Sequence, residues 1–159
     1  MERKMRRFRQ QLPMEETKEI LYKGRECVIA VSGDDDYPYA VPINYVYDGE
    51  HIYLHSAKEG HKIDALRRNP KMSLCVVAQG DIVPEEFTTY FRSAIVFGRA
   101  RLIEDDDEKE EALWKLSQKY CIGLDATEEI AKFLKAVAII EITIDSITGK
   151  ESIELTRQR

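Results

Sequence analysis

The segment from His55 to Lys62 holds the residues with the clearest potential for chemistry. It reads HSAKEGHK and places two imidazoles, a hydroxyl, a glycine and two lysines close together. Ile63 and Leu66 follow as an apolar pair, which indicates that a helix begins here. A hydroxyl, a lysine and a flexible glycine at a helix start are groups that proteins use to hold a phosphate.

A simpler interpretation of the same segment remains open. Ser56 and Glu59 match the S-x-x-E pattern of a capping box, in which the two side chains only satisfy amides at the helix end. Lys62 would then be a solvated helix lysine. Spacing alone favours this simpler interpretation, because the pattern is common.

The histidines alone do not define a catalytic centre. His55 lies on a strand, and its neighbours Leu54 and Ser56 do not build a nucleophile triad. His51 and His55 would be two metal ligands without a third, which is a poor zinc site. We therefore predict no metal and leave catalysis by His55 as the less favoured option.

A hairpin is predicted to position this segment. Residues 39–47 alternate, with Val41, Ile43, Tyr45 and Tyr47 on one face and Pro42, Asn44 and Val46 on the other. A turn at residues 48–49 then leads to a second arm over residues 52–56. The helix after Gly60 should end at Asn69-Pro70.

The remaining elements form a mainly β chain with flanking helices. Residues 80–89 contain Gly80 and Pro84 and are predicted to be a loop. An acidic run at 104–107 should cap the following helix. The predicted helices span 13–23, 108–120 and 125–135, the last with a capping box at 125–128, and the predicted strands span 26–32, 38–47, 51–56, 72–79, 90–103 and 138–145.

Composition sets independent bounds. The chain has 159 residues, of which 43% are hydrophobic, so it suits one domain. Its net charge of −5 argues against a general nucleic-acid binder. No apolar run is long enough for a membrane span or a signal peptide, so we expect a cytoplasmic protein. Cys27, Cys75 and Cys121 lack redox or zinc spacing.

Residues 1–12 form a basic N-terminal arm. Residues 1–9 hold five Lys or Arg and one Glu. Such an arm could touch an acidic lipid or nucleic acid, but a solvated arm, or one draped over a partner, is the simpler interpretation. We therefore predict neither a nucleic-acid nor a membrane partner.

Several motifs, in order along the chain, resemble one protein family. They are residues 5–7, 37–39, 41–45, 52–57, 60–62, 69–70, 93–100 and 147–150. Together they resemble the flavin-binding split-barrel proteins related to pyridoxamine 5′-phosphate oxidase, most closely the nitroimidazole-reductase-like (nitroimidazole resistance) branch. The acidic run at 34–36 departs from the family pattern and leaves the length of that turn open. The resemblance implies one FMN-binding split β-barrel domain over residues 13–155.

The resemblance also implies a set of cofactor contacts. Ser56 and Lys62 would hold the FMN phosphate, with His61 as a weaker, pH-dependent contact. His55 would lie near the ribityl chain or the phosphate, and Ser93 near the phosphate of the same or the opposing subunit. The strand around Pro42, Ile43, Asn44 and Tyr45 would hold the flavin ring through its backbone. The tyrosines at 37, 39, 45, 47 and 53 could line a cleft, but their spacing favours cross-strand packing.

The family pattern implies a homodimer with the flavin between subunits. The leading hypothesis is an oxidoreductase that passes electrons from NADH or NADPH through FMN to a small, nitroaromatic-like substrate. A deazaflavin- or haem-binding protein of the same fold and a non-enzymatic flavin-binding protein stay open. Oxidation of pyridoxamine phosphate itself is disfavoured, because the family's longer C-terminal substrate segment is not present after Lys150.

Overall fold

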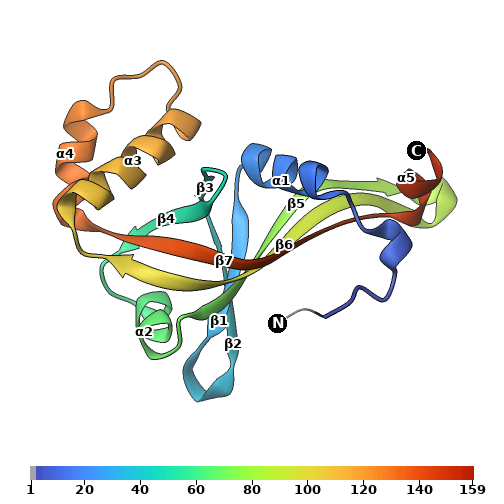
Figure 1. Cartoon of the computed structure of the whole chain (residues 1–159), viewed down its shortest axis with the longest axis horizontal. Helices are drawn as coiled ribbons and strands as arrows, with labels where there is room; N and C mark the ends of the chain where they lie inside the picture. The colour runs from blue at the N-terminus through green and yellow to red at the C-terminus, as the bar shows by residue number, and fades with distance from the viewer. Residues whose placement is uncertain (1–2) are drawn as a thin grey trace.

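A computed structural model describes residues 3–159 of the chain. Within them, one antiparallel seven-stranded sheet has the order β2-β1-β5-β6-β7-β4-β3. Helices flank it, so the expected mainly β architecture is confirmed (Figure 1). The strands are β1 Cys27–Ser32, β2 Pro38–Ile43, β3 Val46–Tyr47, β4 His51–Ala57, β5 Lys71–Val83, β6 Thr88–Ile103 and β7 Val137–Glu151; the helices are α1 Met14–Lys23, α2 His61–Arg68, α3 Asp106–Tyr120, α4 Thr127–Ala136 and α5 Ile153–Arg157.

The sheet closes on itself because of one short connection. Strands β2 and β3 are the two ends of the strand order, yet only Asn44 and Tyr45 separate them in the chain. Two residues span less than about 8 Å, so the two edges of the sheet must meet there. This closure produces a barrel and places residues 44–45 at its seam.

The barrel interior is the main hydrophobic core. The predicted alternation of residues 39–47 between two faces is confirmed, since Tyr45 and Tyr47 belong to this core and Val41 and Ile43 pack against it. Strand β7 contributes Ile140 and Ile142 in the same alternating manner. Burying each such side chain stabilises the fold by roughly 1.5–3 kcal/mol.

A second core lies on the outer face of the sheet. Helices α3 and α4 cover this face at one end of the molecule (Figure 1). Val46, Tyr53 and Ile139, which point away from the barrel interior, pack there against Leu113 and Leu116 of α3. Asp105 caps α3 by accepting a hydrogen bond from the Glu108 amide at 2.9 Å, so the predicted acidic cap is confirmed.

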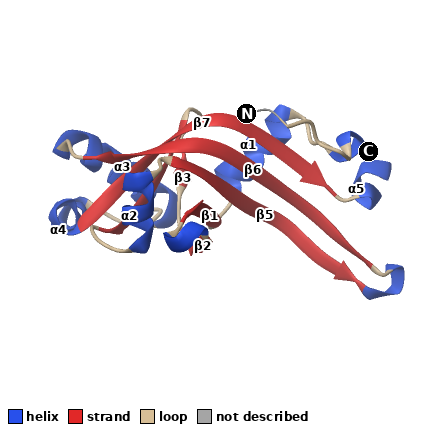
Figure 2. Cartoon of the chain, turned by 90° about the horizontal axis from the view of Figure 1, so that it is seen from below, coloured by secondary structure: helices blue, strands red, loops and turns tan. Residues whose placement is uncertain are grey.

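Strands β5, β6 and β7 continue past the barrel as a long arm (Figure 2). Helix α5 follows β7 and lies near the end of this arm. None of the helices in residues 3–159 has both the length and the apolar character needed to cross a membrane.

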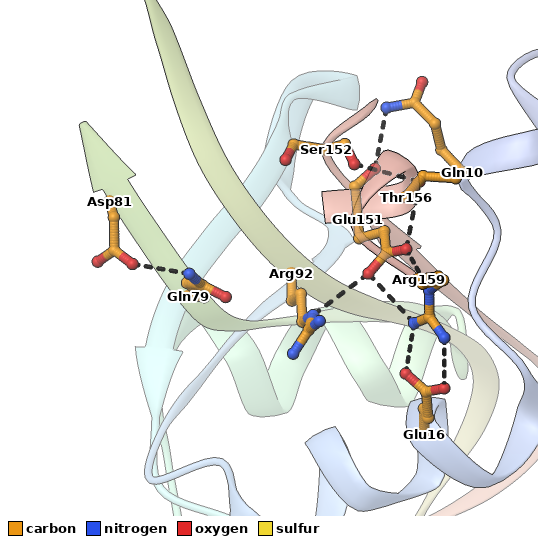
Figure 3. A network of polar contacts seen from close by, with 9 residues as sticks. All are labelled: Gln10, Glu16, Gln79, Asp81, Arg92, Glu151, Ser152, Thr156 and Arg159. Carbon is orange, nitrogen blue, oxygen red and sulfur yellow. Dashed lines mark hydrogen bonds and ion pairs between the residues drawn. The ribbon is translucent and has the colours of Figure 1, made fainter. Parts of the chain in front are cut away.

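A buried carboxylate fastens α5 to the arm and to α1 (Figure 3). The Glu151 side chain is 2% exposed and accepts hydrogen bonds from Arg92 at 3.3 Å and Arg159 at 2.6 Å. Arg159 also pairs with Glu16 of α1. Burial acts to raise the pKa of Glu151, but the hydrogen bonds and charge of Arg159 outweigh it and lower that pKa.

The prediction of a loop over residues 80–89 is wrong. Strand β5 runs to Val83 and β6 starts at Thr88, with a short 3₁₀ turn at Pro84–Glu86 between them. Gly80 pairs with Phe91 inside the hairpin, because a strand tolerates one glycine. Pro84 begins the 3₁₀ turn, where its missing amide proton is not needed.

Three further expectations need correction. Residues 39–47 do not form one strand: β2 pairs with β1, and only Val46–Tyr47 pairs with β4 as the hairpin. The capping box at 125–128 is not formed, because Asp125 accepts instead from the amide and hydroxyl of Thr127. The last strand extends to Glu151, since it pairs with β6 along the arm.

Candidate functional site

Lys62 lies in the first turn of α2, and its ammonium forms no ion pair with a carboxylate of residues 3–159. Burial lowers the pKa of its ammonium, and no carboxylate contributes to that shift. Gly60, the residue before the helix, has φ +130° and no side chain with which to cap the first amides. A partly buried cation beside uncapped helix amides forms a site that favours an anion.

The histidine of β4 lies close to this cation. Burial lowers the pKa of His55, and the positive charge of Lys62 lowers it further. His55 is therefore a neutral imidazole near pH 7. Together with Asn44 it lines a cavity of about 380 Å³ beneath α3 and α4.

Ser56 and His61 have contacts of their own. The Ser56 hydroxyl donates to the carbonyl of Ala57 at 2.9 Å, so it does not cap α2, and the capping-box interpretation of Ser56 and Glu59 is wrong. His61 accepts a hydrogen bond from the Asp34 amide at 3.1 Å and stacks on Tyr39 with 4.2 Å between ring centroids. His61 thus supports the turn before β2, where the family pattern is interrupted.

The four residues proposed as the flavin platform divide between the two faces of the sheet. Ile43 and Tyr45 point into the barrel core, and the Tyr45 hydroxyl donates to the Leu21 carbonyl at 2.7 Å. Pro42 and Asn44 are exposed. Asn44 donates to the Arg25 carbonyl at 3.1 Å. Most tyrosines of this region pack within the fold, which favours the packing interpretation over the cleft.

Two residues at the end of α3 bind the barrel seam, and sequence reasoning missed them. The Tyr120 hydroxyl accepts from the Tyr45 amide at 3.0 Å and lies 2.8 Å from the Tyr45 carbonyl, to which it can donate. Lys119 donates to the same carbonyl at 2.8 Å and lies 3.8 Å from the centroid of the Tyr45 ring. Burial lowers the pKa of Lys119 to about 8. Neither residue belongs to a motif that would mark it as a contact of the seam.

Within one chain, Ser93 lies far in space from Ser56 and Lys62, the other residues predicted to contact the phosphate. It pairs with Lys150 of β7, whereas Ser56 pairs with Ala138 of the same strand. Twelve residues of β7 separate these two positions, which corresponds to roughly 40 Å along a strand. One chain therefore does not bring Ser93 and Lys62 to the same small ligand.

The match to known proteins covers almost the whole domain. A family model described as pyridoxamine 5′-phosphate oxidase matches residues 13–151. The chain belongs to this family. The recognition made from its motifs is confirmed, and so is the split-barrel fold.

Individual relatives are more distant. A candidate 5-nitroimidazole antibiotic resistance protein from Bacteroides thetaiotaomicron VPI-5482 is 26% identical, with a TM-score of 0.76 and coverage of 89% of this chain and 86% of that chain. A FAD- and heme-binding protein from Mycobacterium smegmatis is 24% identical over 90% of this chain and 73% of that chain, with a TM-score of 0.76, and shows the fold alone.

A curated relative matches over a shorter stretch. An uncharacterized protein of Rhizobium meliloti (strain 1021) is 40% identical over 67 residues. This stretch is 41% of the present chain and only 38% of that protein. A match of this length implies no activity for the chain.

Proposed function

We propose that the protein is a homodimeric, FMN-dependent oxidoreductase that passes electrons from NADH or NADPH to a small, nitroaromatic-like substrate. The observation that carries this proposal is Lys62 at the start of α2, which has no carboxylate partner in the described part of the chain, within a chain of this family that resembles a 5-nitroimidazole resistance protein along most of its length. A partly buried lysine of this kind has a clear use if it meets a phosphate.

The residues present suit the phosphate of FMN. Lys62 and the uncapped amides of α2 supply positive charge and hydrogen-bond donors, and Ser56 can turn its hydroxyl from Ala57 toward the ligand. His61 is less suited to this role, because its Nε2 already accepts from the Asp34 amide. We therefore assign phosphate binding to Ser56 and Lys62 and a supporting role to His61.

The chain's own groups would bind and orient, while bound FMN supplies the hydride and electron chemistry. Tyr120 and Lys119 already bond the amide and the carbonyl of Tyr45, so a flat ring would meet the backbone of Asn44 and of the strand before it. His55 is neutral near pH 7 because burial and Lys62 both lower its pKa. It is therefore better suited to hydrogen bonding than to donating a proton.

The exposed face of the sheet supports a dimer. Val28, Ile95 and Phe97 are 44%, 40% and 44% exposed, and the register places Val28, Cys75 and Ile95 in one row across β1, β5 and β6. A contiguous apolar face of this kind usually marks an interface. If Ser93 also contacts a cofactor, its distance from Lys62 requires that this cofactor be bound mainly by the other subunit.

Two half-reactions test this function. FMN-loaded protein is mixed anaerobically with NADH or NADPH, and bleaching of the flavin absorbance is followed; nitrobenzene or 2-nitroimidazole is then added. We expect bleaching by one donor and reoxidation by a nitro compound. A protein that binds FMN stoichiometrically but is reduced by neither donor would be a flavin carrier and would refute the enzymatic proposal.

A further inference from the structure

The cavity beneath α3 and α4 has an apolar lining. Its volume is about 380 Å³, which lies within the range of small-molecule sites. The two helices and the loop between them provide apolar walls from Leu113, Leu116, Leu124, Ala126, Ile130 and Phe133. Asn44 and His55, which come from the sheet side, are the polar groups opposite these walls.

The rim of the cavity exposes apolar side chains to solvent. Leu124 is 73% exposed and Phe133 is 45% exposed, although both line the cavity. Covering such side chains with an apolar ligand is favourable, because it removes apolar surface from water. The cavity is therefore open to a ligand from outside and gains free energy from one that is apolar.

The surroundings of the cavity disfavour an ionic ligand of either sign. The carboxylates of Asp125 and Glu129 lie in its lining and would repel an anion. A cation would lose its hydration water against the apolar walls, because Asp125 and Glu129 lie exposed at the rim and no carboxylate of residues 3–159 lines the sheet side. An uncharged ligand avoids both costs.

The sheet side still offers hydrogen bonds. The His55 imidazole makes no hydrogen bond within residues 3–159, and a neutral imidazole offers one donor and one acceptor. The Asn44 amide nitrogen is used by the Arg25 carbonyl, which leaves its carbonyl oxygen available within the same residues. A polar group on the ligand would find partners here.

We propose that this cavity is the substrate site and that it takes an uncharged molecule of one or two aromatic rings carrying one hydrogen-bonding group, which contacts His55. The inference rests on the proposed oxidoreductase function and adds to it the chemical class of the substrate and the place where it binds. The aromatic part would pack between Leu116 and Phe133, and the polar group would face the sheet.

Calorimetric titration of the FMN-loaded protein tests the proposal. The probes are 2-naphthol and two charged molecules of the same ring size, 2-naphthoate and 2-naphthylmethylammonium. We expect 2-naphthol to bind with a Kd on the order of 10 µM, the affinity typical of a small ligand buried in an apolar pocket. Each charged probe should bind about tenfold or more weakly.

Two variants locate the binding. Ser117→Leu places a larger side chain into the cavity from α3, where Ser117 is partly buried, and should weaken 2-naphthol binding about tenfold or more. Ile122→Ala is the matched control, because Ile122 is 82% exposed in the neighbouring loop and does not line the cavity. It should change the Kd less than about twofold. Circular dichroism confirms that both variants fold.

The outcomes separate this inference from the proposed function. Absence of 2-naphthol binding, equal binding of all three probes, or unchanged binding by a folded Ser117→Leu protein overturns the inference and leaves FMN binding untouched. Release of FMN by 2-naphthol also overturns it, since the cavity would then belong to the cofactor. If the protein binds no FMN, the proposed function fails, and titration of the unloaded protein with the same probes still decides whether the cavity binds them.

Discussion

Removal of the Lys62 ammonium should weaken the binding of FMN much more than the binding of riboflavin. Lys62→Met keeps most of the aliphatic stem and deletes the ammonium, which leaves no carboxylate of residues 3–159 without its partner. A hydrogen bond to a charged group contributes about 1.5–3 kcal/mol, and we expect the lower half of this range because Lys62 is partly exposed. The Kd for FMN should therefore rise roughly 10- to 50-fold.

Fluorescence quenching of each flavin on titration with protein measures both affinities. Riboflavin lacks the phosphate, so its Kd should change less than about twofold in Lys62→Met. Arg67→Met, an exposed residue in the last turn of the same helix, serves as the control and should bind both flavins like the unmodified protein. Equal losses for FMN and riboflavin in Lys62→Met would refute the assignment of Lys62 to the phosphate.

Three other perturbations probe the interface, the histidine and the arm. Phe97→Glu puts a charge on the exposed sheet face and should give a folded monomer by sedimentation, with FMN affinity lost; a persistent dimer would place the interface elsewhere. His55→Asn should keep flavin reduction by the nicotinamide within about tenfold, or ~1.4 kcal/mol, whereas a hundredfold loss in nitro-compound reduction with FMN still bound would identify a general acid. Glu151→Gln should lower the free energy of unfolding in urea by about 1–3 kcal/mol at pH 7. Because the folded-state pKa of Glu151 is lowered, this difference is present above the unfolded pKa and shrinks as pH falls through the folded one; a difference independent of pH would refute the role of its charge.

Alternation along single strands made the barrel core predictable. Val41, Ile43 and Tyr45 lie on the predicted face, because the two-residue period of a strand depends only on local geometry. The break at residues 44–45 was not predictable in this way, since the alternation continues through it. Which neighbour each half pairs with is decided by closure of the whole sheet.

Residues of the site that act over long sequence distances escaped prediction for a related reason. Tyr120 accepts a hydrogen bond from the Tyr45 amide, although the two residues are 75 positions apart in the sequence. No local pattern marks a helix residue that forms such a bond with the barrel seam. Conversely, Ser56 and Ser93 both fit the family motifs, but only the register along β7 reveals how far apart they lie. The family resemblance implies that His61 contacts the phosphate beside Lys62, but successive helix positions point in directions about 100° apart, and His61 contacts the Asp34 amide instead.

The identity and stoichiometry of the bound cofactor test the central claim most directly. The protein is saturated with FMN, freed of excess ligand by gel filtration, and analysed by native mass spectrometry together with its absorption spectrum. We predict a dimer that carries one FMN per chain and the spectrum of an oxidised flavin. A monomer holding stoichiometric FMN would contradict the shared site, and a protein that retains no FMN but copurifies with a haem or a deazaflavin would contradict the cofactor assignment.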